Sequence, residues 1–199
     1  MAEKSEGLQS TRTFVSNPNY NEKASSTLAA PFIQVRSNDD EQDGFPDSYD
    51  LEISVSGVET QNIWHFFLGL VFNYTLSDVI ATQMQSLALI EARTATGVSW
   101  VEASGSLLLK QHSPLYDVTY TTKLDYDENP LGSISNWTLG YLLEEYNQRN
   151  ETTVFDGDIV VMPYGDPNSL FVKVHLEVPK FQWIEYMAGI LEGLKYAWI

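Results

Sequence analysis

Cysteine is absent from this sequence of 199 residues. Its absence excludes disulfide bonds, metal sites built from thiolates and catalysis by a cysteine nucleophile. It does not indicate a cellular compartment, which stays open on this evidence.

Basic residues are scarce, since 11 Lys and Arg stand against 27 Asp and Glu, for a formal net charge of −16. A surface that binds nucleic acid needs clustered Lys and Arg to neutralise phosphates. The composition therefore argues against a nucleic acid partner. It favours cations or basic proteins instead.

Long apolar runs are also missing. A helix that crosses a bilayer needs about 20 apolar residues, and no such run is present; the residues after Met1 also lack the apolar core of a signal peptide. We therefore expect a soluble chain or one that lacks its membrane segments. The length and a hydrophobic content of 43% suit one domain with a full core.

Two apolar stretches within residues 50–76 organise the sequence and face each other across a polar joint. In the first, Leu51, Ile53 and Val55 alternate with polar residues, which is typical of a half-buried strand. The second, residues 64–75, is apolar on both sides and predicts a central strand covered on both faces. These strands predict a mainly β fold, an antiparallel β-sandwich.

Further strands are predicted at residues 32–35, 84–92, 98–110, 116–124, 159–162 and 170–178. Gly105 predicts a bulge in one of them. Residues 1–28 are polar and predict a flexible N-terminal arm. We expect the sandwich domain to occupy residues 29–180.

Two helices are expected. Residues 139–148 change to helical spacing after Thr138, a possible N-cap, and predict a short surface helix. Residues 181–199 bring large apolar side chains onto one helical face. This C-terminal amphipathic helix could cap the core, bind a partner or lead into a membrane span that the chain truncates, because its end is rich in aromatic residues.

The acidic stretch 39–50 resembles a calcium-binding loop. Oxygen donors stand at loop positions 1, 3, 5, 9 and 12, which are Asp39, Glu41, Asp43, Asp47 and Asp50. Gly44, at position 6, would permit the sharp turn that brings these side chains onto one calcium ion. The flanking helices of such loops are absent, so a solvated acidic turn is the alternative.

Three sequons for N-glycosylation occur, at Asn73, Asn136 and Asn150. Their number is close to that expected by chance. Asn150 is the favoured acceptor because it follows the predicted surface helix, whereas Asn73 ends the strand predicted to be most buried.

Catalytic groups do not gather in the sequence. The histidines are scattered, at His65, His112 and His175, and Gly97–Val101 lacks the second glycine of a nucleophile elbow. The sequence therefore predicts no enzyme and no cofactor other than calcium. An acidic hydrolase would need a cleft that joins two carboxylates.

A secreted sandwich that binds carbohydrate or another ligand is an alternative. Tryptophan and tyrosine rings suit such sites because each combines an apolar face with a polar edge. The candidates are Trp64, Trp100, Trp137 and the tyrosine-rich strand 116–124.

Four short motifs resemble the transmembrane protein 231 family, in the same order along the chain. They are QDG at 42–44, MQS at 84–86, YNQRNETTV at 146–154 and KYAW at 195–198. The similarity runs from residue 31 to the end, and these motifs are structural rather than catalytic.

This resemblance implies a non-enzymatic domain of a ciliary membrane protein. Members of the family have two membrane helices that enclose a large extracellular domain, and they belong to the Meckel syndrome or B9 complex of the ciliary transition zone. The chain would be that enclosed domain, on the extracellular side, with the membrane helices missing or truncated. The partners implied are B9-domain proteins, tectonics and other membrane proteins, with which the family limits entry of membrane proteins into the cilium and supports ciliogenesis.

Overall fold

The computed structural model describes residues 30–77, 81–116, 123–126, 143–144 and 146–187. Its strands are β1 (Pro31–Asn38), β2 (Ser48–Ser56), β3 (His65–Ser77), β4 (Ala81–Arg93), β5 (Trp100–Gln111), β6 (Leu115–Tyr116), β7 (Lys123–Tyr126), β8 (Glu151–Met162), β9 (Ser169–Glu177) and β10 (Tyr186–Met187). A 3-10 helix, η2 (Thr60–Asn62), precedes β3. The predicted mainly β fold is confirmed.

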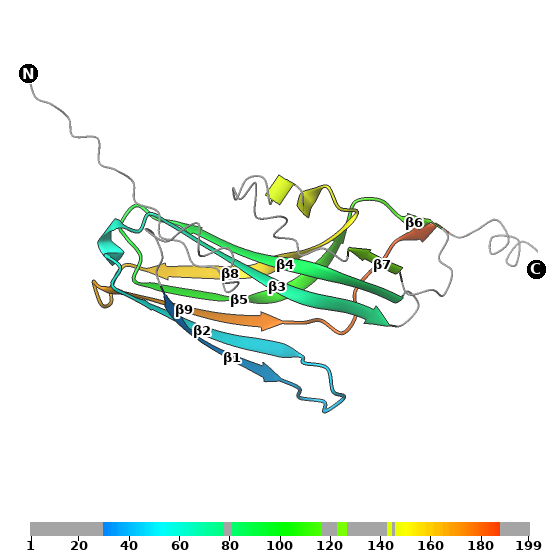
Figure 1. Cartoon of the computed structure of the whole chain (residues 1–199), viewed down its shortest axis with the longest axis horizontal. Helices are drawn as coiled ribbons and strands as arrows, with labels where there is room; N and C mark the ends of the chain where they lie inside the picture. Colours follow the sequence, from blue (N-terminus) through cyan, green and yellow to red (C-terminus); the bar gives the residue numbers. More distant parts are fainter. Residues whose placement is uncertain (1–29, 78–80, 117–122, 127–142, 145, 188–199) are drawn as a thin grey trace, which may run out of the picture.

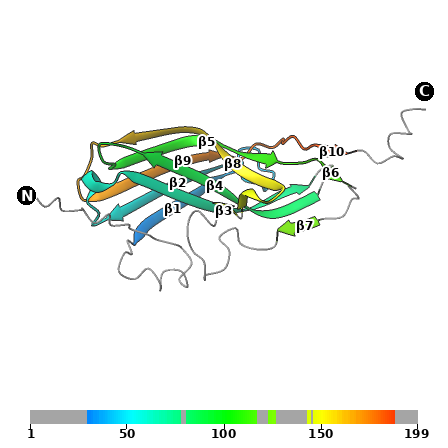
Figure 2. The same cartoon turned by 90° about the horizontal axis from the view of Figure 1, so that it is seen from above.

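Two sheets form the sandwich, and their long strands run along the length of the molecule (Figures 1 and 2). One sheet has the strand order β1-β2-β9-β5-β8, and the other has the order β3-β4-β7. Most neighbours are antiparallel, but β5 pairs with β9 in parallel, as does β4 with β7. The short strands β10 and β6 form a separate parallel pair.

The core lies between these two sheets. Alternate residues of β9 point inward and are buried, because successive side chains of a strand point to opposite faces: Leu170, Val172, Val174 and Leu176. They join one cluster with Met84 and Ile90 of β4. The rings of Tyr49 and Phe72 meet with centroids 5.6 Å apart, so β2 and β3 face each other across the core as predicted.

Strand β3 is not the central strand that its sequence predicts. Among the described strands it pairs with β4 alone. Phe66, Leu68 and the other even-numbered apolar residues pack against the core, whereas Gly69 and Val71 are exposed on the outer face. The prediction was wrong because it took the apolar residues on the outer face of this strand as a sign that a second layer covers them.

The predicted bulge at Gly105 is also absent, since β5 and β8 keep one continuous register with Gly105 opposite Gly157. A Cβ atom on either glycine would collide with the backbone of the opposite strand. These glycines therefore serve close approach of two strands rather than a bulge. Strand β8 begins at Glu151, well before the predicted residue 159.

The two predicted helices have different outcomes. In the predicted surface helix, residues 143–144 and 146–147 have helical backbone. Residues 139–142 and 145 lie outside the described residues. Residues 181–185 are not helical and Tyr186–Met187 form β10, so no helix begins at Phe181. The carboxamide of Gln182 explains this path because it pairs with the backbone of β5. Its Nε2 donates to Leu107 O (3.2 Å), and its Oε1 accepts from Leu109 N (3.2 Å).

Several predicted segments lie beyond what the structure describes. They are the arm 1–28, the strand portion 117–122 and the end of the C-terminal segment, residues 188–199. Of the described part, no helix is both long and apolar enough to cross a membrane.

One hydroxyl group joins the two sheets where the edges of β4 and β8 meet. Tyr146 Oη accepts hydrogen bonds from Leu87 N in β4 (3.0 Å) and from Thr153 N in β8 (2.8 Å). Thr153 Oγ1 in turn donates to Leu87 O (3.1 Å). Tyr146 and Thr153 are buried, so these bonds satisfy backbone groups that water does not reach.

Removing this hydroxyl group should weaken the fold. In Tyr146→Phe, two buried N–H groups lose their acceptor, and each should cost roughly 1–3 kcal/mol of the free energy of unfolding. Urea denaturation measures this loss. Tyr164→Phe is the control, because Tyr164 is 90% exposed and should leave the midpoint unchanged. Equal midpoints for Tyr146→Phe and the natural chain would contradict the structural role.

Candidate functional site

The acidic loop, residues 39–47, connects β1 to β2. Its carboxylates hold the backbone of the loop itself. Asp39 accepts hydrogen bonds from the N–H groups of Asp43 (3.2 Å) and Gly44 (2.9 Å). Asp47 accepts from the N–H groups of Asp40 (2.8 Å) and Glu41 (3.4 Å). Gly44 has a φ of +87°, as a sharp turn at this position requires.

The ammonium group of Lys180 lies among three of the predicted calcium ligands. Lys180 Nζ is 2.5 Å from Glu41 Oε2, 3.4 Å from Asp43 Oδ2 and 3.4 Å from Asp47 Oδ1. The bond to Glu41 is the main cause that raises the pKa of Lys180 above its usual value. The pKa of Asp47 is lowered, first by the N–H group of Asp40 and also by Lys180. A residue of the chain thus supplies a cation to this loop.

Asp50 does not join the others. Its carboxylate accepts from Asn38 Nδ2 (2.9 Å) and contacts His175 Nδ1 (2.7 Å) on the sheet. These two bonds, His175 first, lower the pKa of Asp50. In the part of the chain with described coordinates, no three His, Asp or Glu side chains are placed to hold a metal ion. Calcium binding stays a prediction.

Calcium bound in this loop would have to displace Lys180. The calcium hypothesis therefore predicts that Lys180→Met binds calcium more tightly than the natural chain, and that adding Asp43→Ala abolishes binding. Titration calorimetry at millimolar calcium, the range of extracellular modules, measures this, with magnesium as the control ion. No heat from any of the three chains would contradict the hypothesis.

The sequons differ in accessibility. Asn73 is exposed on β3. Asn150 Nδ2 donates to Ser113 O (3.1 Å) and to Glu151 Oε1 (2.7 Å). A glycan on Asn150 would replace one hydrogen of this amide and so break one of these bonds, which makes Asn73 the acceptor that the fold accommodates more easily. Asn136 lies outside the described residues. Use of each sequon stays a prediction.

Two histidines pair with carboxylates on strands, as expected of structural residues. His65 Nε2 lies 2.9 Å from Glu91 Oε1, and His175 has its contact with Asp50. His112 is exposed in the turn after β5.

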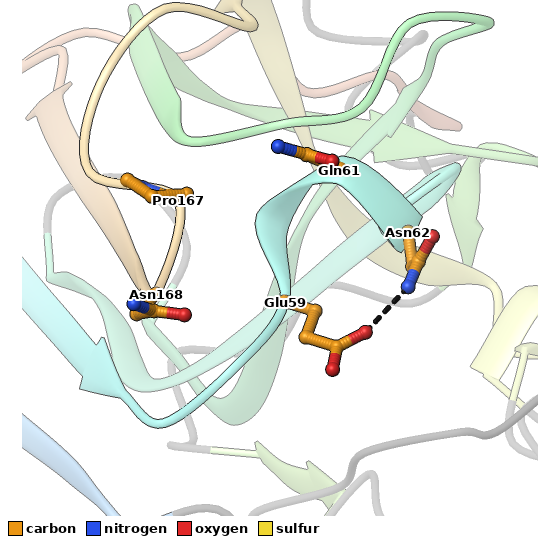
Figure 3. A pocket seen from close by; sticks show the side chains of 5 residues that line it. All are labelled: Glu59, Gln61, Asn62, Pro167 and Asn168. Atoms are coloured by element: carbon orange, nitrogen blue, oxygen red, sulfur yellow. Dashed lines mark hydrogen bonds between the residues drawn. The ribbon is translucent and has the colours of Figure 1, made fainter.

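A shallow cleft lies beside the 3-10 helix, with a volume of about 220 Å³ (Figure 3). Its lining residues are Glu59, Gln61, Asn62, Pro167 and Asn168. Glu59 is the one carboxylate among them, and it accepts a hydrogen bond from Asn62 Nδ2 (2.6 Å). This cleft therefore does not provide the pair of carboxylates that an acidic hydrolase needs.

The aromatic candidates for ligand binding are spread out. Trp64 is 54% exposed just before β3. Trp100 begins β5 and packs against Phe171, with ring centroids 4.3 Å apart. Trp137 and residues 117–122 lie outside the described residues.

The comparison with protein families identifies the family to which the chain belongs. The family model described as Transmembrane protein 231 matches residues 1–199. The chain belongs to the transmembrane protein 231 family. It is thus a member of a family of membrane proteins.

Individual transmembrane protein 231 sequences are similar along most of the chain. Identity is 32% over 190 residues with the protein of Xenopus tropicalis, 26% over 187 residues with that of Mus musculus, and 25% over 209 residues with that of Homo sapiens. These matches cover 92%, 92% and 98% of this chain, but 59%, 59% and 62% of the relatives. The chain therefore spans about three fifths of their length. No solved structure matches it.

The motif at 146–154, one of the four that resemble transmembrane protein 231, forms the junction between the sheets. Besides the hydroxyl group of Tyr146, Arg149 Nη1 donates to Gln85 O in β4 (2.9 Å), and its guanidinium lies 5.3 Å from the Tyr146 ring centroid. Thr152 and Thr153 are buried. Sequence reasoning missed these structural roles, although the run of polar residues beside one tyrosine was visible.

Proposed function

We propose that this chain is a non-enzymatic interaction domain of a membrane protein at the ciliary transition zone, on the extracellular side. The family match along the whole chain carries this proposal. The domain would work with B9-domain proteins, tectonics and other membrane proteins as part of the barrier that limits entry of membrane proteins into the cilium.

The use of polar side chains supports a binding role over a catalytic one. Tyr146 joins the sheets, and Lys180 pairs with carboxylates of the acidic loop. His175 and Asp50 bond each other on an open sheet face. These groups already hold the fold together, whereas a catalytic site needs groups that converge on a substrate.

Proximity labelling of the full-length protein in ciliated cells tests this function. A biotin ligase fused to the protein should label transition-zone proteins above a control, which is the same ligase on an unrelated protein of the ciliary membrane. Even labelling across other membranes, with no enrichment over the control, would contradict the proposal.

Glycosidase treatment tests the extracellular placement. The full-length protein from a eukaryotic host should shift in mobility, and Thr75→Ala, which removes the exposed sequon at Asn73, should remove the corresponding part of the shift. Asn150→Asp is the matched variant, because it keeps the Oδ1 acceptor that binds Ser113 N (2.9 Å). A natural protein with no shift would contradict exposure to the glycosylation machinery.

A further inference from the structure

The outer face of the five-stranded sheet carries an apolar row at one end. Directly paired residues point to the same face of a sheet. The pairings therefore place one row across β1, β2, β9, β5 and β8, made of Phe32, Ser54, Phe171, Trp100 and Met162. Trp100 and Phe171 stack in its middle, and the ends are open, with Phe32 71% and Met162 37% exposed.

The apolar surface continues along β8 and then gives way to charge. Val160, two residues before Met162, is 51% exposed on the same face. Next along β8 come Asp158 and Asp156, both exposed and opposite Ser104 and Ser106 of β5.

Among the described residues, these two carboxylates lack the basic partner that Glu102 and Asp50 have on this face. Glu102 has Lys173 at 3.9 Å, and Asp50 has His175. In the residues with known placement, Asp156 and Asp158 have no ion-pair partner. The face thus combines an aromatic centre with negative charge that the fold does not compensate.

This combination selects the chemistry of a partner. Apolar surface that is open to water favours association, and buried aromatic residues commonly dominate binding energy at interfaces. A second copy of a chain with net charge −16 would meet like charge, which opposes association. A complementary partner offers apolar side chains beside Lys or Arg.

We propose that the outer face of β5, β8 and β9 docks a basic segment of a partner protein. Apolar side chains of that segment cover Trp100, Phe171 and Met162, and its Lys or Arg side chains lie against Asp156 and Asp158. The inference rests on the proposed role as an interaction domain, but not on the ciliary location.

Binding of three synthetic 12-residue peptides to the full chain tests the proposal. One alternates Lys and Leu, the second alternates Glu and Leu, and the third alternates Lys and Ser. Fluorescence anisotropy of labelled peptides should show the tightest binding for Lys/Leu, because it alone matches both the apolar row and the charge. The proposal would be overturned if either of the other two peptides bound as tightly as Lys/Leu.

Variants locate the binding face. Asp156→Asn with Asp158→Asn should weaken Lys/Leu binding about three- to tenfold, since two exposed ion pairs are lost. Val160→Ser with Met162→Ser should weaken it about tenfold through lost apolar contact. Thr75→Ser, on the exposed face of β3, is the control and should change nothing. Urea midpoints confirm that each variant remains folded.

Other occupants give distinct results. Cosedimentation with phosphatidylcholine vesicles that Val160→Ser with Met162→Ser abolishes would identify a lipid surface instead. Concentration-dependent dimerisation that the same variant abolishes would identify a second copy. Either result would overturn the proposal while leaving the labelling at the transition zone unaffected, so failure here is distinguishable from failure of the proposed function.

Discussion

The hydroxyl group of Tyr146 joins the two sheets at an edge where apolar packing cannot satisfy their buried backbone groups. Burial of β4 and β8 side by side leaves backbone groups of Leu87 and Thr153 without water, and unpaired groups of that kind are expensive. The hydroxyl oxygen of Tyr146 accepts a hydrogen bond from each of these two N–H groups. The order of the sandwich at this edge therefore depends on the polar group of one buried side chain.

Much of the fold follows from alternation of apolar residues. Strand β9 was predicted at 170–178 and lies at Ser169–Glu177, because its alternate residues differ sharply in polarity. Strand β3 shows where this reasoning ends, since Val71 is apolar although exposed. The first half of β8 was missed because Asp156, Gly157 and Asp158 give no apolar period, and only their pairing with β5 makes them a strand.

The acidic loop was predictable as a turn, and its composition pointed to a cation. The sequence of the loop does not show which cation binds it. Lys180 lies far along the chain and reaches the loop only because β2 and β9 are neighbours, with Ser48 opposite Glu177. The role of the motif at 146–154 was hidden for the same reason, as its partners lie in β4.

The segment after β9 has a mechanical consequence. Lys180 ties it to the loop between β1 and β2, Gln182 ties it to β5, and Glu185 exchanges two bonds with Gln111. A pull on the chain beyond Met187 would therefore load several strands at once, rather than peel β9 away one bond at a time. Such an attachment would spread tension applied at this end of the described chain across the five-stranded sheet.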